Sequence, residues 1–91
     1  MVYEWDENKN IINRLKHGID FETAALVFGD DDRIVKYDES HSIDEDRYIT
    51  IGNICGTIVI VMVVYTEEED VTRIISARIA NKSETEEYYR G

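Results

Sequence analysis

We single out seven side chains whose types could carry out chemistry on a negatively charged substrate. They are, in chain order, Lys9, Lys16, His17, Arg47, Arg73, Arg78 and Lys82. Guanidinium and ammonium groups bind phosphate and stabilise negative charge that develops in a reaction, and an imidazole can transfer protons near neutral pH. The sequence therefore offers phosphate binding and acid–base chemistry, if the fold brings these groups together.

His17 lies in the last turn of a predicted helix, directly before Gly18. The helix dipole favours a protonated imidazole at this position, so His17 could act as an acid or as a phosphate ligand. The alternative is that His17 only satisfies the last carbonyls of the helix before the glycine ends it. Position alone leaves both interpretations open.

Arg73 and Arg78 belong to the last predicted strand, in which successive side chains alternate between two faces. Their odd separation predicts opposite faces, and only a β-bulge between them would bring both to one pocket. The structural alternative for each arginine is an ion pair with one of the many neighbouring acids.

Other kinds of chemistry have less support in the sequence. His17 and His41 belong to different segments without the spacing of a metal site, so we expect no metal and no other cofactor. Cys55 stands beside Gly56 with no basic residue nearby, which favours inert packing over nucleophilic catalysis. A glycine-rich phosphate loop is absent from the sequence.

Composition indicates a globular protein. The chain has 91 residues and a net charge of −10, with 43% hydrophobic and 33% charged residues, which suits a single domain over residues 1–91. Acidity argues against nucleic acid as a partner, but it is concentrated in the middle of the chain, mostly in Asp30–Asp32, Asp44–Asp46 and Glu67–Asp70. The longest apolar run, Thr57–Tyr65, is too short for a membrane span, and the N-terminus lacks signal-peptide features, so we expect a cytoplasmic protein without membrane contact.

Two helices are predicted after a short strand at Val2–Glu4. Asp6 and Asp20 are the expected N-caps, and Gly18 and Gly29 end the two helices. Apolar residues recur at helical spacing, which predicts that each helix buries one stripe. The stripes are Ile11, Ile12 and Leu15 in the first helix, and Phe21, Ala24, Ala25 and Phe28 in the second.

Four later segments are rich in β-branched and aromatic residues, and we expect them to be strands. They are Arg33–Tyr37, Arg47–Gly52, Thr57–Thr66 and Val71–Ala80. Thr57–Tyr65 is apolar on both faces and should be central, while short connections indicate antiparallel hairpins. Ser83 and Glu86 form a capping-box pattern for a last helix. The expected fold is α+β in the order β-α-α-β-β-β-β-α, with a helical hairpin on an antiparallel meander sheet and a C-terminal helix.

Several ordered motifs resemble the signatures of the BrnT toxin family. The first runs from Tyr3-Glu4-Trp5-Asp6 through Lys16-His17-Gly18 to Val27-Phe28, the second is Asp46-Arg47-Tyr48-Ile49-x-Ile51-Gly52, and the third is Arg73-Ile74-Ile75-Ser76-Ala77-Arg78-x-Ala80. They occur at matching spacing and span nearly the whole chain, which makes the resemblance specific.

This resemblance implies a RelE-like fold and a ribonuclease toxin of a type II toxin–antitoxin pair, which inhibits translation by cleaving RNA. It also implies a BrnA-like antitoxin, similar to ribbon-helix-helix DNA-binding proteins, as the partner. Operator DNA would be contacted only through that antitoxin, in a complex that represses its own operon. An acidic toxin surface would suit a basic antitoxin segment.

Metal-free RNA cleavage needs a base, an acid and cations around the phosphorane. Among the motif residues, His17 is the candidate for proton transfer, Arg73 or Arg78 for transition-state charge, and Lys16 for positioning phosphate. The candidate catalytic residues are thus His17, Arg73 and Arg78, and the candidate substrate-binding residues are Lys9, Lys16, Arg47 and Lys82.

Three alternatives remain at this point. Arg47 and Arg78 could brace the sheet through carboxylates such as Glu45 or Asp46. The whole chain could be a catalytically inactive module that binds an antitoxin and modulates operon repression. A plain oligomeric structural domain is the third possibility.

Overall fold

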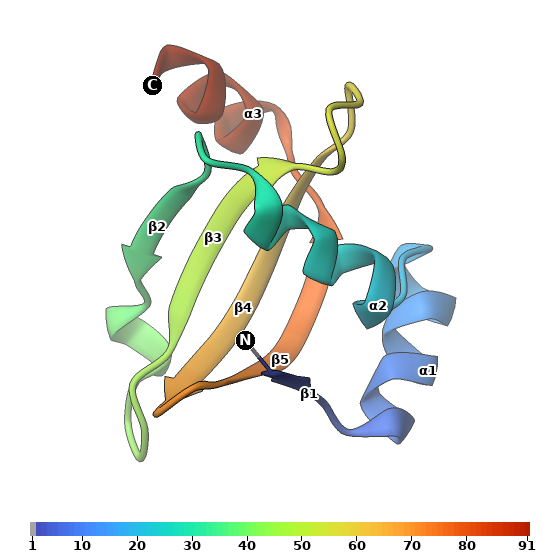
Figure 1. The fold of residues 1–91 in the computed structure, drawn as a ribbon, viewed down its shortest axis with the longest axis vertical. Coiled ribbons are helices and arrows are strands. Elements are labelled where there is room, and N and C mark those ends of the chain that lie inside the picture. The colour runs from blue at the N-terminus through green and yellow to red at the C-terminus, as the bar shows by residue number, and fades with distance from the viewer. Residues whose placement is uncertain (1) are drawn as a thin grey trace.

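The structure, a computed structural model, describes residues 2–91. Its elements are β1 (Val2–Glu4), α1 (Glu7–His17), α2 (Phe21–Ala24), the 3-10 helix η1 (Ala25–Gly29), β2 (Ile34–Tyr37), the 3-10 helix η2 (Glu39–His41), β3 (Tyr48–Asn53), β4 (Ile60–Glu68), β5 (Val71–Ile79) and α3 (Lys82–Arg90). This succession confirms the predicted α+β order (Figure 1). Within residues 2–91, no helix combines the length and apolar character that crossing a membrane requires.

Five strands form one sheet in the order β1-β5-β4-β3-β2. Strands β2 to β5 pair antiparallel with their neighbours in sequence, whereas β1 pairs parallel with β5. The sheet is therefore mixed, and the prediction of an antiparallel sheet is wrong at β1. A parallel pair needs a long connection between its strands. Here the connection from β1 to β5 contains the three remaining strands, β2, β3 and β4, and the helices α1 and α2.

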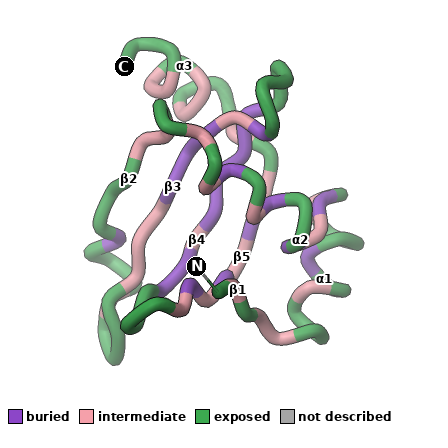
Figure 2. Tube along the Cα trace, in the orientation of Figure 1, coloured by how far each residue is buried: buried purple, intermediate pink, exposed green. Residues whose placement is uncertain are grey.

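The two faces of the sheet are covered differently. On the first face, α2 and η1 run across the strands (Figure 1). Phe21, Ala24 and Val27 pack there against buried residues of β4 and β5. The second face, which we call the α3 face, carries Ile51, Ile60 and Met62 with Tyr88 of α3 against them. Buried residues accordingly follow β3, β4 and β5 (Figure 2). Because α3 packs at one end only, no helix of residues 2–91 covers the other end of the α3 face.

Strand β4 is central in the sheet, as its apolar run predicts. Residues 60 to 63 are all buried, because helices lie on both faces at this level. The predicted strand begins too early, since Thr57 and Ile58 belong to the preceding turn, where Ile58 is 90% exposed.

A β-bulge interrupts the pairing of β4 with β5. Val64 pairs with Ser76 and Tyr65 pairs with Ile74, so Ile75 has no partner on β4. One extra residue in β5 reverses the alternation of side chains on either side of it. The bulge therefore changes which face the residues before Ile75 occupy relative to those after it.

Helix α1 packs against the edge of β5 through a polar residue. The buried amide of Asn13 donates to the carbonyl of Ala77 at 2.7 Å and accepts the Ala77 N–H at 3.2 Å. Asn13 thus satisfies the backbone of β5 beyond the end of the short β1. The predicted burial of the α1 stripe is wrong, since Ile11, Ile12 and Leu15 are 52%, 61% and 82% exposed.

The helix ends agree with the sequence in part. Asp6 and Asp20 cap α1 and α2, and Gly18 ends α1 at a φ of 74° while donating to the Arg14 carbonyl. The second predicted helix changes to 3-10 form after Ala24. The predicted Ser83–Glu86 capping box is wrong, because the box is formed by Asn81 and Glu84. Asn81 caps two residues earlier because α3 starts at Lys82.

Candidate functional site

The bulge brings the arginines of β5 onto one face. Met62, Val64 and Thr66 follow one another at alternate positions of β4, and their partners on β5 are Arg78, Ser76 and Arg73. Paired residues in adjacent strands share a face, so both arginines lie on the α3 face. Ideal alternation predicted opposite faces, and this expectation is corrected by the unpaired Ile75.

Arg78 is held by an acid of α3. Its Nη1 and Nη2 donate to Glu84 at 2.7 and 2.9 Å, and its Nη1 also donates to the Ile79 carbonyl at 3.3 Å. Burial raises the pKa of Glu84, but hydrogen bonds from Arg78 and from the Asn81 N–H outweigh this and hold the pKa below its usual value. Arg78 therefore orders the start of α3. Its partner is Glu84, not the Glu45 or Asp46 that the sequence suggested.

Arg73 has a much looser partner. A single contact of 3.3 Å joins Arg73 Nη1 to Glu4 of β1, and the two side chains are 42% and 51% exposed. Exposed ion pairs of this kind contribute little to stability and exchange readily with other ligands. The guanidinium of Arg73 is accordingly available to an anion in a way that Arg78 is not.

Arg47 directly precedes β3 and continues its register. Asp38 donates its N–H to the Arg47 carbonyl at 2.8 Å, which extends the β2–β3 pairing by one residue. Alternation from Ile51 and Ile49 puts Arg47 on the α3 face, opposite Thr66. Arg47 and Arg73 thus flank Thr66 in one row across the sheet, with about 10 Å between their Cα atoms, or two strand spacings.

The side chain of Arg47 has no acidic partner among residues 2–91, and its buried Nε makes no hydrogen bond there. Arg47 lines a surface hollow of about 260 Å³ with residues of the η2–β3 loop. The other residues that line it are His41, Ile43, Asp44 and Glu45. The sequence pointed to His41 only as a poor metal ligand and did not place it among the site residues.

The candidate cations of the helices lie apart from this row. Lys9 and Lys16 are exposed on α1, half-buried His17 is its last residue, and exposed Lys82 is the first residue of α3. Within residues 2–91, no hydrogen bond or ion pair orients the His17 ring. The hollow beside Arg47 is lined by none of these four residues.

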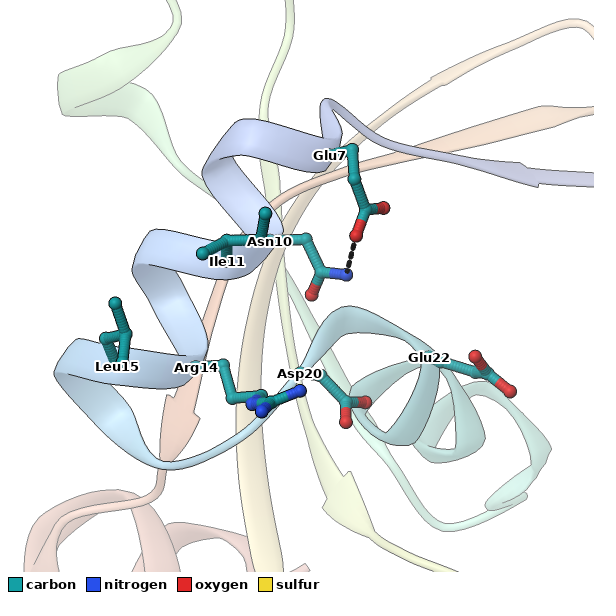
Figure 3. Close-up of a pocket in the computed structure, with 7 residues that line it drawn as sticks. All are labelled: Glu7, Asn10, Ile11, Arg14, Leu15, Asp20 and Glu22. Carbon is teal, nitrogen blue, oxygen red and sulfur yellow. Dashed lines mark hydrogen bonds between the residues drawn. The ribbon is translucent and has the colours of Figure 1, made fainter.

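A second hollow, of about 330 Å³, lies between α1 and α2 (Figure 3). Ile11 and Leu15 project from α1 on one side of it, and Arg14 extends toward Asp20. Glu7 and Glu22 make the rim acidic, and Glu7 accepts a hydrogen bond of 3.2 Å from Asn10. Unpartnered aliphatic groups beside carboxylates are suited to a basic, amphipathic peptide better than to RNA.

Metal and thiol chemistry have no built site in the part of the chain that the structure describes. No group of three or more His, Cys, Asp or Glu residues among residues 2–91 has the geometry to hold a metal ion. Cys55 is exposed in the turn after β3, with a φ of 49°, so the expectation that it packs inertly is wrong with respect to burial.

Comparison with known families gives the class of the protein. Residues 5–84 match the family model described as "Ribonuclease toxin, BrnT, of type II toxin-antitoxin system". The class is thus that of the ribonuclease toxins, whose partners are antitoxins. The matched segment covers most of the chain, and the protein belongs to the BrnT toxin family, as its motifs indicated. A search of curated proteins found no match.

Proposed function

We propose that this protein inhibits translation by cleaving RNA without a metal ion, through attack of a ribose 2′-hydroxyl on the adjacent phosphate. Its membership of the ribonuclease toxin family supports this proposal. The observation that carries it is the row on the α3 face in which Arg47 and Arg73 flank Thr66. Two guanidinium groups at this separation can converge on one phosphate and stabilise the charge of a phosphorane.

The remaining candidates take supporting roles in the proposal. Arg78, which is bound to Glu84, positions α3 instead of contacting phosphate. Lys9 and Lys16 are seven residues apart on one flank of α1, and with Lys82 they would contact neighbouring phosphates of the RNA strand. His17, at the end of the same helix, stays a prediction for proton transfer.

Purified toxin, separated from its antitoxin, tests the proposal on free RNA and in a translation extract, each with and without a chelator. We expect cleavage that survives the chelator and a fall in kcat/KM of roughly 100-fold or more for Arg47→Ala and for Arg73→Ala. Arg90→Ala is the matched control, because Arg90 is an exposed arginine in the last turn of α3. Wild-type protein that cleaves neither substrate, or an Arg73→Ala variant as active as Arg90→Ala, would overturn the proposal.

The antitoxin, in this proposal, is a ribbon-helix-helix protein whose basic segment covers the exposed aliphatic face of α1. Leu15 is 82% exposed and borders the acidic hollow of Figure 3. We expect Leu15→Glu to weaken the complex at least 10-fold in calorimetry. Ile58→Glu is the control, because Ile58 is a similarly exposed aliphatic residue in the turn between β3 and β4. Equal affinities of the two variants would exclude α1 as the docking face.

A second candidate function is that of an inactive antitoxin-binding module. The bidentate pairing of Arg78 with Glu84 and the net charge of −10 favour it, because both reduce the positive potential available to RNA. Such a protein would bind its antitoxin, but the wild-type toxin produced alone would neither slow growth nor degrade RNA.

A further inference from the structure

His41 is held by a buried carboxylate at the end of η2. Its Nδ1 lies 3.0 Å from Asp38 Oδ2 and 3.2 Å from Oδ1, and Asp38 is 8% exposed. The rest of the His41 side chain is open to solvent, with 68% exposure. A ring that is anchored at one nitrogen and exposed elsewhere presents its other nitrogen to a ligand.

The partner of Nδ1 determines the tautomer of the ring. A carboxylate only accepts hydrogen bonds, so Nδ1 carries the proton and donates it to Asp38. In the neutral ring, Nε2 is then unprotonated and is the basic atom. Nothing among residues 2–91 occupies Nε2, and this arrangement is that of a histidine oriented for proton transfer.

The backbone around His41 is fixed by Ser42. The Ser42 hydroxyl donates to the Asp38 carbonyl at 2.6 Å and accepts the Arg47 N–H at 2.9 Å. Together with the Asp38 N–H to Arg47 carbonyl bond, it fastens the η2 turn to the start of β3. His41 and Arg47 therefore face the same hollow from a common support.

The hollow combines the groups that cleavage of an RNA phosphodiester requires. Arg47 supplies a cation whose Nε lacks a hydrogen-bond partner, and His41 supplies a base. Ile43 is 87% exposed at the same hollow and offers an aliphatic contact for a base or ribose. The charged groups around the His41 ring are Asp38, Asp44, Glu45 and Arg47.

We propose that His41 is a catalytic residue of this toxin, the general base for RNA cleavage, and that Asp38 is its positioning residue. His41 Nε2 removes the proton of the ribose 2′-hydroxyl, and the 2′-oxygen forms a bond to phosphorus. The bond from phosphorus to the 5′-oxygen breaks, and that oxygen takes a proton from water. The products are a 2′,3′-cyclic phosphate and a free 5′-hydroxyl. This inference rests on the proposed ribonuclease function, and it assigns to His41 the proton transfer that the sequence suggested for His17.

The test compares His41→Ala with His17→Ala on whichever RNA substrate the wild-type toxin cleaves. General acid–base catalysis contributes about 10²- to 10⁴-fold, so we expect kcat to fall at least 100-fold for His41→Ala with KM little changed. Added imidazole should restore part of the lost rate, and the limb of the pH–rate profile that reports the base should disappear. Glu39→Ala, at an exposed residue of η2 that does not line the hollow, should keep wild-type kcat, and imidazole should not restore activity to His17→Ala.

Asp38→Asn tests the positioning role. We expect it to lower kcat about 10-fold or more in the His41 protein and to have no further effect in the His41→Ala background, because the carboxylate acts only through the ring. Thermal unfolding of each variant controls for folding, since Asp38 is buried.

Two results would overturn the inference while leaving the proposed function intact. The first is that the wild-type toxin cleaves RNA and that a folded His41→Ala variant cleaves it with the same kcat. The second is a loss of kcat in His17→Ala that imidazole rescues. A wild-type toxin that cleaves no RNA would instead overturn the proposed function itself.

Discussion

Arg78 at the end of β5 and Glu84 in the first turn of α3 share two hydrogen bonds, of 2.7 and 2.9 Å. The same carboxylate accepts the Asn81 N–H at 2.9 Å and so completes the capping box of α3. One acid thus serves both the sheet and the helix. The sequence suggested Arg78 as a catalytic residue, and our proposal assigns it a structural role instead.

We expect Arg78→Ala to lower the free energy of unfolding by about 2 kcal/mol, because it leaves a half-buried carboxylate without its charged donor. Lys36→Ala is the control, since the Lys36–Glu87 pair at 2.6 Å is 42% exposed on both sides and should contribute less than about 1 kcal/mol. Urea denaturation of both variants measures the difference. Equal losses would contradict the anchoring role.

The contribution of Glu84 to stability depends on pH. Its pKa is lower in the folded protein than in the unfolded chain, so the ionised carboxylate stabilises the fold. This contribution is complete above the unfolded pKa of about 4.3 and is lost as the pH falls through the lower folded pKa. We expect Glu84→Gln to be less stable than wild type at pH 7 and the difference to vanish in acid. A difference that stayed constant down to strongly acidic pH would exclude an electrostatic origin.

In the proposed function, Glu4 would compete with a substrate phosphate for Arg73. Because the contact of 3.3 Å is exposed, removal of the charge should cost little stability and free the guanidinium. We expect Glu4→Gln to lower KM for RNA several-fold, with an unchanged unfolding midpoint. Glu22→Gln removes an equal charge from the rim of the α1 hollow and serves as the control. If KM changed equally in Glu4→Gln and Glu22→Gln, the proposal that Arg73 binds phosphate would be contradicted.

Gly52 permits the close approach of β3 to η1. A Cβ at this position would lie 2.6 Å from Val27 Cγ2 and 2.9 Å from Arg33 Cβ. Overpacking of this kind costs about 1–3 kcal/mol, so we expect Gly52→Ala to lower the unfolding temperature clearly. Gly29→Ala should be tolerated, because a Cβ at that position would have no neighbouring atom within 4 Å. Similar unfolding temperatures of the two variants would show that η1 can move away.

Much of the fold follows from local patterns in the sequence. The caps at Asp6 and Asp20, the glycine at the end of α1 and the central apolar strand are all set by neighbouring residues and were predicted. The parallel pairing of β1 was missed because it joins Val2–Glu4 to Val71–Arg73, which lie far apart in the sequence. Exposure of the α1 stripe was missed because helical spacing identifies an apolar face without identifying what covers it.

The site was less predictable than the fold. Alternation alone places Arg73 and Arg78 on opposite faces of the sheet. No local sequence pattern predicts that Ile75, between them, is unpaired. The spacing of Asp38 and His41, three residues apart in a turn, was the available signal for an oriented imidazole. This spacing points to a functional site only once the fold places Arg47 beside His41 at the same hollow.

The bulge at Ile75 links the length of β5 to the faces that its arginines occupy. Deletion of Ile75 would remove the bulge and leave Arg73 and Arg78 an even number of positions apart, so strict alternation would keep both arginines on the α3 face. A chain shortened by this single aliphatic residue would keep every ionisable group of the toxin and also the common orientation of the two arginines. The bulge therefore accommodates the one residue by which β5 exceeds strict alternation, and it lets a strand of this length carry both guanidinium groups on one side.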